Sequence, residues 1–316
     1  PAISSMTLNL SANILGLDNA ATPLGIKAMK DLQALNSRPD TASDAQILFL
    51  VLNTSAVTLF PVTILLYRAQ LGAADPASVF IPILIATSCS TLAGLLVTAW
   101  VQRIRLADTV VLAYVGGAFA LLLSLVAWFA TLGAEELQRQ SSLVSNLLIM
   151  SLVVLFLVVA HRRAVNVYET FIDGARQGFE TAIGIIPYLL AMLVAIGVFR
   201  ASGGLDLLLG LLREVVAAGG WDTRWVDAMP TGLMKPLSGS GARAMMIDTM
   251  NTFGVDSFQG RLAATMQGST ETTFYVLAVY FGAVGIRHAR HALACGLAAD
   301  AAGISAAIAV AYWFYG

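Results

Sequence analysis

The sequence predicts an all-α, polytopic membrane protein, and three observations support this. First, 58% of the 316 residues are hydrophobic and the mean hydropathy is +0.78. Second, Lys, Arg, Asp and Glu make up only 12% of the chain, about half the fraction found in soluble domains. Third, the charge-free runs are each long enough to cross a hydrocarbon core of ~30 Å. These runs are Ala45–Tyr67, Pro76–Gln102, Val110–Ala134, Ser141–Ala160 and Thr181–Phe199. The composition excludes a soluble enzyme, a secreted disulfide scaffold and a nucleic-acid binder.

The apolar segments are of two kinds. Val110–Leu132 and Leu143–Ala160 are evenly aliphatic and predict a plain, lipid-facing hairpin. Four others are interrupted by small or polar residues: Leu10–Met29, Leu50–Ile64, Met229–Met250 and Leu262–Val284. Free backbone groups in hydrocarbon cost several kcal/mol each unless protein or water pairs them. We therefore expect broken or re-entrant helices inside the bundle, an arrangement typical of transporter binding sites when it occurs in both halves of a chain.

The two halves of the chain show a weak internal repeat. Two pairs of segments align near an offset of 214: Leu52–Phe60 with Met266–Phe274, and Pro76–Trp100 with Ala289–Trp313. Upstream of these, Gly16–Met29 falls opposite Pro236–Met250. We predict a first repeat over residues 1–107, the plain hairpin over 108–163, and a second repeat over 164–316. The first repeat lacks a counterpart of Asn166–Arg200, so we expect a corresponding segment upstream of Pro1.

Short basic loops predict the orientation, because Lys and Arg concentrate on the cytoplasmic side. The basic residues that flank the plain hairpin should be cytoplasmic: Arg103, Arg105, Arg162 and Arg163. Counting spans then places Arg287–His291 inside, whereas its repeat counterpart Gly72–Asp75 lies outside. The repeats should therefore have inverted topology. Arg200 and Arg213 do not fit this scheme.

Two passages carry a resemblance to a known family. The N-terminal SANILGLDNAATPLGIKAMKDLQALN, followed by LNTSAVTLFPVTI, resembles spore maturation protein A. The C-terminal MKPLSGSGARAMMIDTM, followed by GRLAATMQGSTETTFYVLAVYFGAVGI, resembles spore maturation protein B. The chain thus resembles a fusion of two members of the nucleoside recognition (Gate) family, which shares segments with concentrative nucleoside and ferrous-iron transporters. The resemblance implies a membrane protein but does not name a solute.

In the first half, the candidate solute-binding residues lie in the interrupted segments: Asn19, Thr22, Asn53, Ser55 and Thr58. Such side chains also form hydrogen bonds between membrane helices, worth about 0.6–2 kcal/mol each. Unwound backbone and half-helix ends can instead present donors and acceptors to a solute. The density of NTSAVT, with four polar groups in six residues, favours binding.

In the second half, Ser238 and Ser240 belong to a predicted turn at a helix N-terminus. Its amides, with Arg243 nearby, could bind an anion; snorkelling of Arg243 to the interface is the alternative. ATP is not expected, because the turn lacks the Gly-Lys-Ser/Thr ending of a phosphate loop. The remaining candidates are the carboxylate Glu271 and its polar neighbours in the sequence: Gln267, Ser269, Thr270 and Thr272.

Three carboxylates lie in apolar surroundings and are ion-coupling candidates: Glu271, Asp300 and Asp248. A charge at the centre of a span costs about 2.5–3.5 kcal/mol, so each should face a partner or a wet cavity. Hydroxyl-bearing neighbours favour a functional role for Glu271, whereas a structural partner explains Asp300 equally well. We find no metal-site spacing and no hydrolase motif, so we expect no metal, no cofactor and no enzymatic activity.

These observations support two hypotheses. The first is a multi-pass secondary transporter or permease in the cytoplasmic (inner) membrane, which moves a small polar, anionic solute between the broken helices and couples to a proton or a sodium ion. The second is a non-transporting scaffold or assembly factor in spore maturation or envelope biogenesis. Under both hypotheses we expect the protein to contact the lipid bilayer and not nucleic acid. Whether it forms a homo-oligomer is left open. A transporter needs its polar groups around a wet cavity, whereas a scaffold pairs them in dry interfaces.

Overall fold

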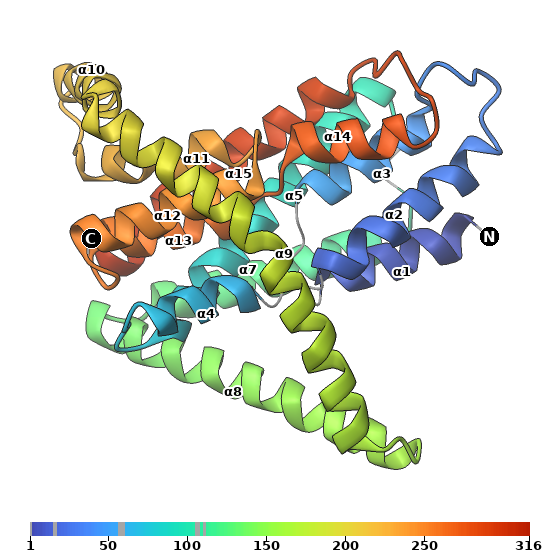
Figure 1. The fold of residues 1–316 in the computed structure, drawn as a ribbon, viewed down its shortest axis with the longest axis horizontal. Helices are drawn as coiled ribbons and strands as arrows, with labels where there is room; N and C mark the ends of the chain where they lie inside the picture. The colour runs from blue at the N-terminus through green and yellow to red at the C-terminus, as the bar shows by residue number, and fades with distance from the viewer. Residues whose placement is uncertain (1, 15–17, 56–60, 105–107, 110–111) are drawn as a thin grey trace.

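The computed structural model describes residues 2–14, 18–55, 61–104, 108–109 and 112–316, and over these residues it is helical, with no strand (Figure 1). The first half contains α1 (Ala2–Ile14), α2 (Asp18–Gln33), α3 (Asp44–Thr54), α4 (Val62–Gln70), η1 (Pro76–Val79) and α5 (Phe80–Gln102). The middle contains η2 (Leu112–Gly116), α7 (Gly117–Ala130) and α8 (Ala134–Arg162). The second half contains α9 (Val167–Ala201), α10 (Gly204–Ala218), η3 (Arg224–Ala228), α11 (Met229–Met234), α12 (Gly239–Phe253), α13 (Phe258–Ser269), α14 (Thr273–Gly282) and α15 (Ala292–Tyr315).

The structure confirms that the helices are broken in the four interrupted segments. Helix α1 ends before α2 begins in the first segment, and α11 ends before α12 begins in the third. In the second segment α3 ends at Thr54 and α4 begins at Val62; in the fourth, α13 ends at Ser269 and α14 begins at Thr273. Both halves therefore contain a helical hairpin, a broken helix and a long helix, in that order.

The long helices α5 and α15 pack antiparallel through the centre of the bundle (Figure 1). The Ser90 hydroxyl donates to the Ala299 carbonyl at 2.9 Å. A Cβ added at Gly94 would lie 3.1 Å from the Ala299 Cβ and 2.9 Å from Val51, so glycine permits the close approach. Antiparallel corresponding helices are what inverted repeats require. The repeat itself and its boundaries stay predictions.

Loops from both halves close each end of the bundle. At one end, the fully buried Arg68 donates to the Val255 carbonyl and to the Asp256 carboxylate, both at 2.8 Å. At the other end, the Arg287 amide donates to the Asp40 carbonyl at 2.8 Å. A buried cation needs a counter-charge and filled hydrogen bonds. Arg68 therefore ties α4 to the loop after α12.

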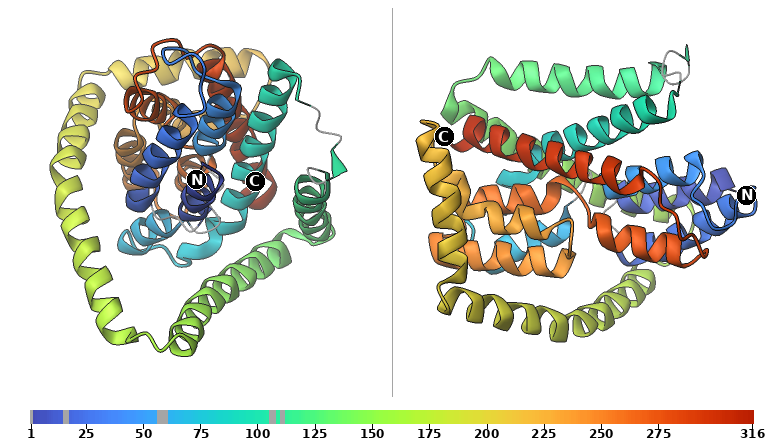
Figure 2. Two further views of the ribbon diagram at one scale, coloured as in Figure 1. Left: turned by 90° about the vertical axis from the view of Figure 1, so that its right-hand side faces the viewer. Right: turned by 90° about the horizontal axis from the view of Figure 1, so that it is seen from above.

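Helices α8, α9 and α10 lie at the periphery, where α8 and α9 form an arc around the bundle (Figure 2). Within the described part of the chain, three helices are long and apolar enough to cross a membrane, or four if the bent pair Leu193–Ala201 and Gly204–Ala218 is one span. The apolar window of α8 is only 6% buried by protein. This exposure agrees with the predicted lipid-facing hairpin.

Of the basic residues predicted to be cytoplasmic, Arg105 lies outside the described residues; Arg103, Arg162, Arg163 and Arg287 lie toward one end of the bundle. Gln102 lies 3.0 Å from His291, so the end of α5 and the start of α15 share that end. Gln138, near the start of α8, donates to the Phe314 carbonyl at 3.2 Å. Helix α8 thus begins at the opposite end, and its 29 residues carry its basic C-terminus back toward the first (Figure 1).

The two arginines that did not fit the charge rule both have acidic partners. Arg200 at the end of α9 forms an ion pair with Asp248 of α12. Arg213 of α10 lies 2.5 Å from Asp227. Paired charges have a smaller net field than free ones, so these two residues weigh less against the predicted orientation, which stays a prediction.

Replacing Arg68 with methionine should lower the melting temperature in detergent. Asp256 and several carbonyls would lose their donor, and the loss of one partner from a buried pair costs about 3–5 kcal/mol. We expect the lower end of that range, because the Asp256 side chain is 31% exposed. Arg139→Ala is the matched control, since Arg139 is 73% exposed in its pair with Glu136 and should leave the melting temperature unchanged. Equal melting temperatures for both variants would contradict the assignment.

A cysteine at Ile104 should escape a membrane-impermeant maleimide added from outside, whereas a cysteine at Gly316 should react. The structure places these positions at opposite ends, and the charge rule assigns the first end to the cytoplasm. Labelling is measured in intact cells after Cys89→Ser and Cys295→Ser. Reaction at position 104 from outside would overturn the orientation.

Candidate functional site

The two broken helices meet at their breaks, as predicted. The Glu271 amide donates to the Thr54 carbonyl at 2.8 Å, and the Thr270 hydroxyl donates to the same carbonyl at 3.2 Å. The last carbonyls of a helix have no partner within the helix, and here the other half of the chain supplies it. Ser55 and Ser269, two of the candidate solute-binding residues, are both fully buried at these breaks.

Asp300 of α15 holds the second break in place. Its carboxylate accepts hydrogen bonds from the hydroxyls of Thr270 and Thr273, the latter at 2.7 Å. The Asp300 residue is 2% exposed. A Cβ at Gly303 would lie 2.9 Å from the Ser269 carbonyl oxygen, so α15 passes directly beneath the break. The described contacts of Asp300 are those of a structural anchor.

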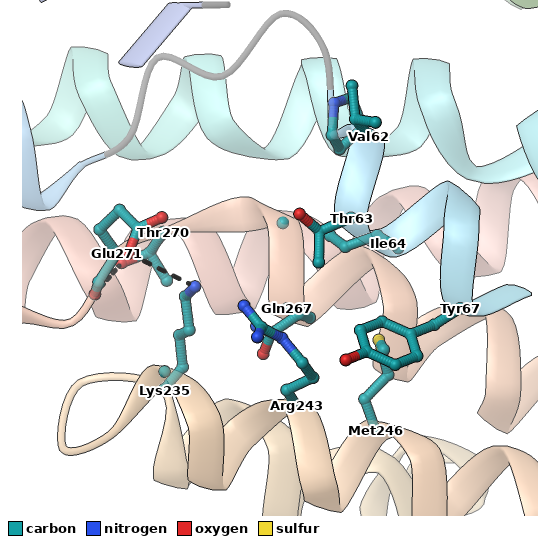
Figure 3. A pocket seen from close by; sticks show the side chains of 13 residues that line it. Val62, Thr63, Ile64, Tyr67, Lys235, Arg243, Met246, Gln267, Thr270 and Glu271 are labelled. Atoms are coloured by element: carbon teal, nitrogen blue, oxygen red, sulfur yellow. Dashed lines mark hydrogen bonds and ion pairs between the residues drawn. The ribbon is translucent and has the colours of Figure 1, made fainter. Parts of the chain in front are cut away.

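A cavity of about 80 Å³ adjoins the second break, which is room for several water molecules. Its walls come from α4, the turn between α11 and α12, α12 itself and the end of α13 (Figure 3). The lining residues are Pro61, Val62, Thr63, Ile64, Tyr67, Lys235, Gly239, Arg243, Met246, Gln267, Gly268, Thr270 and Glu271. The structure therefore brings Arg243, Gln267, Thr270 and Glu271, all predicted site residues, to one cavity.

Glu271 faces the cavity and has a basic partner. The Lys235 Nζ lies 3.7 Å from the Glu271 Oε2 (Figure 3). The side chain of Lys235 is 5% exposed and that of Glu271 34%. Thr272 donates to the same carboxylate through its amide at 3.3 Å and its hydroxyl at 3.4 Å. Lys235, a residue that the sequence reasoning missed, thus supplies a counter-charge to Glu271 in addition to the hydroxyl-bearing neighbours.

Helix α12 begins at the cavity, which confirms the predicted helix N-terminus. Ser238 caps the helix by accepting the Gly241 amide at 3.1 Å, and its hydroxyl lies 3.3 Å from that of Ser240. These hydroxyls serve the turn, whereas Gly239 reaches the cavity wall. The Arg243 guanidinium lies 5.8 Å from the centre of the Tyr67 ring. Among the described residues, no carboxylate lies within 4.0 Å of it.

Like Arg243, the buried Gln267 lacks a partner that its polar group would normally have. It is 5% exposed, and its Oε1 has no hydrogen-bond partner among the described residues. Buried polar atoms are nearly always paired, so an unpaired one calls for an explanation. Because Gln267 lines the cavity, a bound solute or water would explain it.

Other predicted site residues lie elsewhere. Asn53 accepts a hydrogen bond from Asn13 at 2.8 Å and is outside the cavity. Thr22 is half-buried in α2 and is not among the lining residues. The structure places Asn19 in α2 without describing its side chain, and Thr58 lies outside the described residues. Asp248, paired with Arg200, lies away from the cavity. Within the described residues no cluster of His, Cys, Asp or Glu could hold a metal ion.

Asp300→Ala should destabilise the protein, because two buried hydroxyls would lose a charged acceptor. Each such hydrogen bond is worth about 1.5–3 kcal/mol. Asp300→Asn keeps one acceptor oxygen and should be milder. Melting temperature in detergent measures both variants, with the exposed Asp206→Ala as the control expected to match the native chain. A native melting temperature for Asp300→Ala would show that the anchor is dispensable.

Comparisons with known proteins identify the family. The family model described as nucleoside recognition (Gate) matches residues 182–287. Spore maturation protein B of Bacillus subtilis (strain 168) is 47% identical over 154 residues, which cover 49% of this chain and 85% of that protein. Spore maturation protein A of the same organism is 40% identical over 97 residues, which cover 31% of this chain and 50% of that protein. No solved structure matches. The chain therefore belongs to the nucleoside recognition (Gate) family of membrane proteins that includes the spore maturation proteins.

Proposed function

We propose that the chain is a multi-pass transporter or permease of the cytoplasmic membrane that carries a small anionic solute through the cavity between α4, α12 and α13. Family membership supports a transporter-like role in a membrane. The observation that carries the proposal is the presence of two cations, Lys235 and Arg243, in the cavity wall, of which Lys235 pairs with Glu271 and Arg243 has no carboxylate within 4.0 Å among the described residues. The N-terminus of α12 adds a positive end to the same wall.

The position of Arg243 in the cavity wall points to an anion. A cation in a membrane interior is costly unless it has a counter-charge or water. Lys235 has Glu271, but the described neighbour of Arg243 is the face of Tyr67. A carboxylate or phosphate in the cavity would pair with Arg243, as helix N-termini and arginines commonly bind such groups. The free oxygen of Gln267 would accept a donor on the solute or on its water.

Glu271 gives the site a means of coupling. A solute anion that reaches Lys235 competes with Glu271 for the ammonium group. The displaced carboxylate then needs a new counter-charge, which a proton or a sodium ion supplies. Binding of the anion and of the coupling ion would therefore favour each other.

The alternative is a membrane scaffold or assembly factor. It is favoured by the names of the relatives, which are maturation proteins, and by the exposed apolar surface of α8. A scaffold would not need the cavity cations, so variants of Arg243 separate the two functions.

Lys235→Gln and Arg243→Gln should each weaken anion binding about tenfold or more, because each loses a charge-assisted hydrogen bond of about 1.5–3 kcal/mol. The measurement is the thermal shift of the purified protein titrated with phosphate, acetate and succinate at constant ionic strength. Arg139→Gln, on the exposed part of α8, is the control and should bind as the native chain does. Native affinity in both cavity variants, or no shift with any anion in the native chain, would favour the scaffold.

Glu271→Gln should insert and fold normally, since the side-chain shape is kept, and should bind the anion at least as tightly because the competitor for Lys235 is gone. Transport should become uncoupled: reconstituted vesicles should exchange the anion but not accumulate it against a pH or sodium gradient. Glu136→Gln, in the exposed pair with Arg139, is the matched control. Accumulation at the native level in Glu271→Gln would remove the coupling role.

A further inference from the structure

A second buried polar cluster lies on the other side of the helix breaks. We call it the inner cluster; it consists of Asn9, Asn13, Asn53 and Tyr280. The Asn53 Oδ1 accepts from Asn13 at 2.8 Å and from the Tyr280 hydroxyl at 3.2 Å, and Asn9 donates to that hydroxyl at 3.3 Å. Asn9 is 0%, Asn53 3% and Tyr280 4% exposed.

The inner cluster and the cavity use corresponding elements of the two halves. The cluster is built by α1, α3 and α14, and the cavity by the α11–α12 turn, α13 and α4. Asn53 and Gln267 are 214 positions apart, and Tyr67 and Tyr280 are 213 apart. Each place therefore has a carboxamide and a tyrosine at matching positions.

The two places differ in their state. At the cavity, Gln267 has an unpaired oxygen and open space beside it. At the inner cluster, Asn53 uses both ends of its carboxamide, because its Nδ2 also donates to the Phe49 carbonyl at 2.8 Å. A Cβ added at Gly25 would lie 1.9 Å from the Tyr280 oxygen, so the hydroxyl fills the space that glycine leaves. The cavity is open and the inner cluster is closed.

Both places adjoin the same crossing of the breaks. Asn53 directly precedes Thr54, whose carbonyl pairs with the amide of the cavity residue Glu271. The loop after α12 meets Arg68 at the end assigned to the outside. In contrast, Asn36, beyond α2, donates to Gln46 near the opposite end. The α1–α2 and α11–α12 hairpins therefore enter from opposite ends, and a solute that leaves the cavity toward the cytoplasm meets the inner cluster.

We propose that the inner cluster is the cytoplasmic gate of the transport path, with the Tyr280 hydroxyl as its latch. The gate is closed while the cavity is open, and because both share one crossing, opening one closes the other. The Asn9 Oδ1 is buried without a partner among the described residues, which weakens the closed state and leaves it ready to open. The neutral amides and phenol would pass an anion without holding it. This inference rests on the proposed function for the solute path.

The test follows two cysteines by their rate of alkylation with N-ethylmaleimide in membranes. The first is the native Cys295, 1% exposed in the same apolar cluster as Tyr280 and Phe49, after Cys89→Ser. The second is Thr63→Cys in the cavity wall, with both native cysteines replaced by serine. The gate variants are Tyr280→Phe, which removes the latch hydroxyl, and Gly25→Ala, which displaces it.

Gate opening predicts opposite changes. Alkylation of Cys295 should rise about tenfold as a minor open state becomes common, while alkylation at position 63 should fall. Gly174→Ala is the matched control, because nothing lies within 4 Å of its added Cβ, and it should change neither rate.

Two results would overturn the gate. An unchanged Cys295 rate in folded Tyr280→Phe overturns the gate, and so does a rise at both cysteines, which indicates general loosening. If Gly25→Ala does not fold, Tyr280→Phe alone decides. The proposed function fails separately, through native anion affinity in the Lys235 and Arg243 variants, because the alkylation rates require no bound anion.

Discussion

The structure depends on one constraint: a helix that breaks inside a membrane must pair its freed backbone groups within the protein. The end of α3 meets this constraint through the Thr54 carbonyl, which accepts the Glu271 amide from the other half of the chain. That contact brings the two breaks together and aims the Glu271 side chain at the cavity. Asp300 then secures the second break through two hydroxyls. The position of the site thus follows from the hydrogen bonds that pair the backbone groups freed at the breaks.

The cavity is distinguished by incomplete pairing. Elsewhere in the described chain, the buried Arg68 pairs with Asp256 and the half-buried Arg200 pairs with Asp248. In the cavity wall, Arg243 has no carboxylate within 4.0 Å among the described residues, and the Gln267 Oε1 has no hydrogen-bond partner among them. Closely paired charges suit a structural interior, whereas a cation without a close partner beside open space suits the transient anion of the proposed function.

The halves share an order of elements but differ in chemistry. One crossing of broken helices separates a charged, hollow chamber from a neutral, closed one built around Asn53 and Tyr280. A transport path that is open to one side at a time needs one open chamber and one closed chamber on similar arrangements of helices. Tyr280 fills the space beside Gly25, whereas Tyr67 and Arg243 both line the open cavity.

The sequence by itself determined the class of fold and the positions of the breaks. Apolar runs, the small polar residues around Ser55 and Ser269, and the turn before Gly239 act over a few neighbouring residues, so they can be recognised along the chain. Only the tertiary structure decided which polar groups meet. Lys235 and Glu271 are brought together by the packing of the α11–α12 turn on the second break, and Asn53 turns away from the cavity toward Tyr280. Such pairings depend on the placement of whole helices, which local composition does not specify.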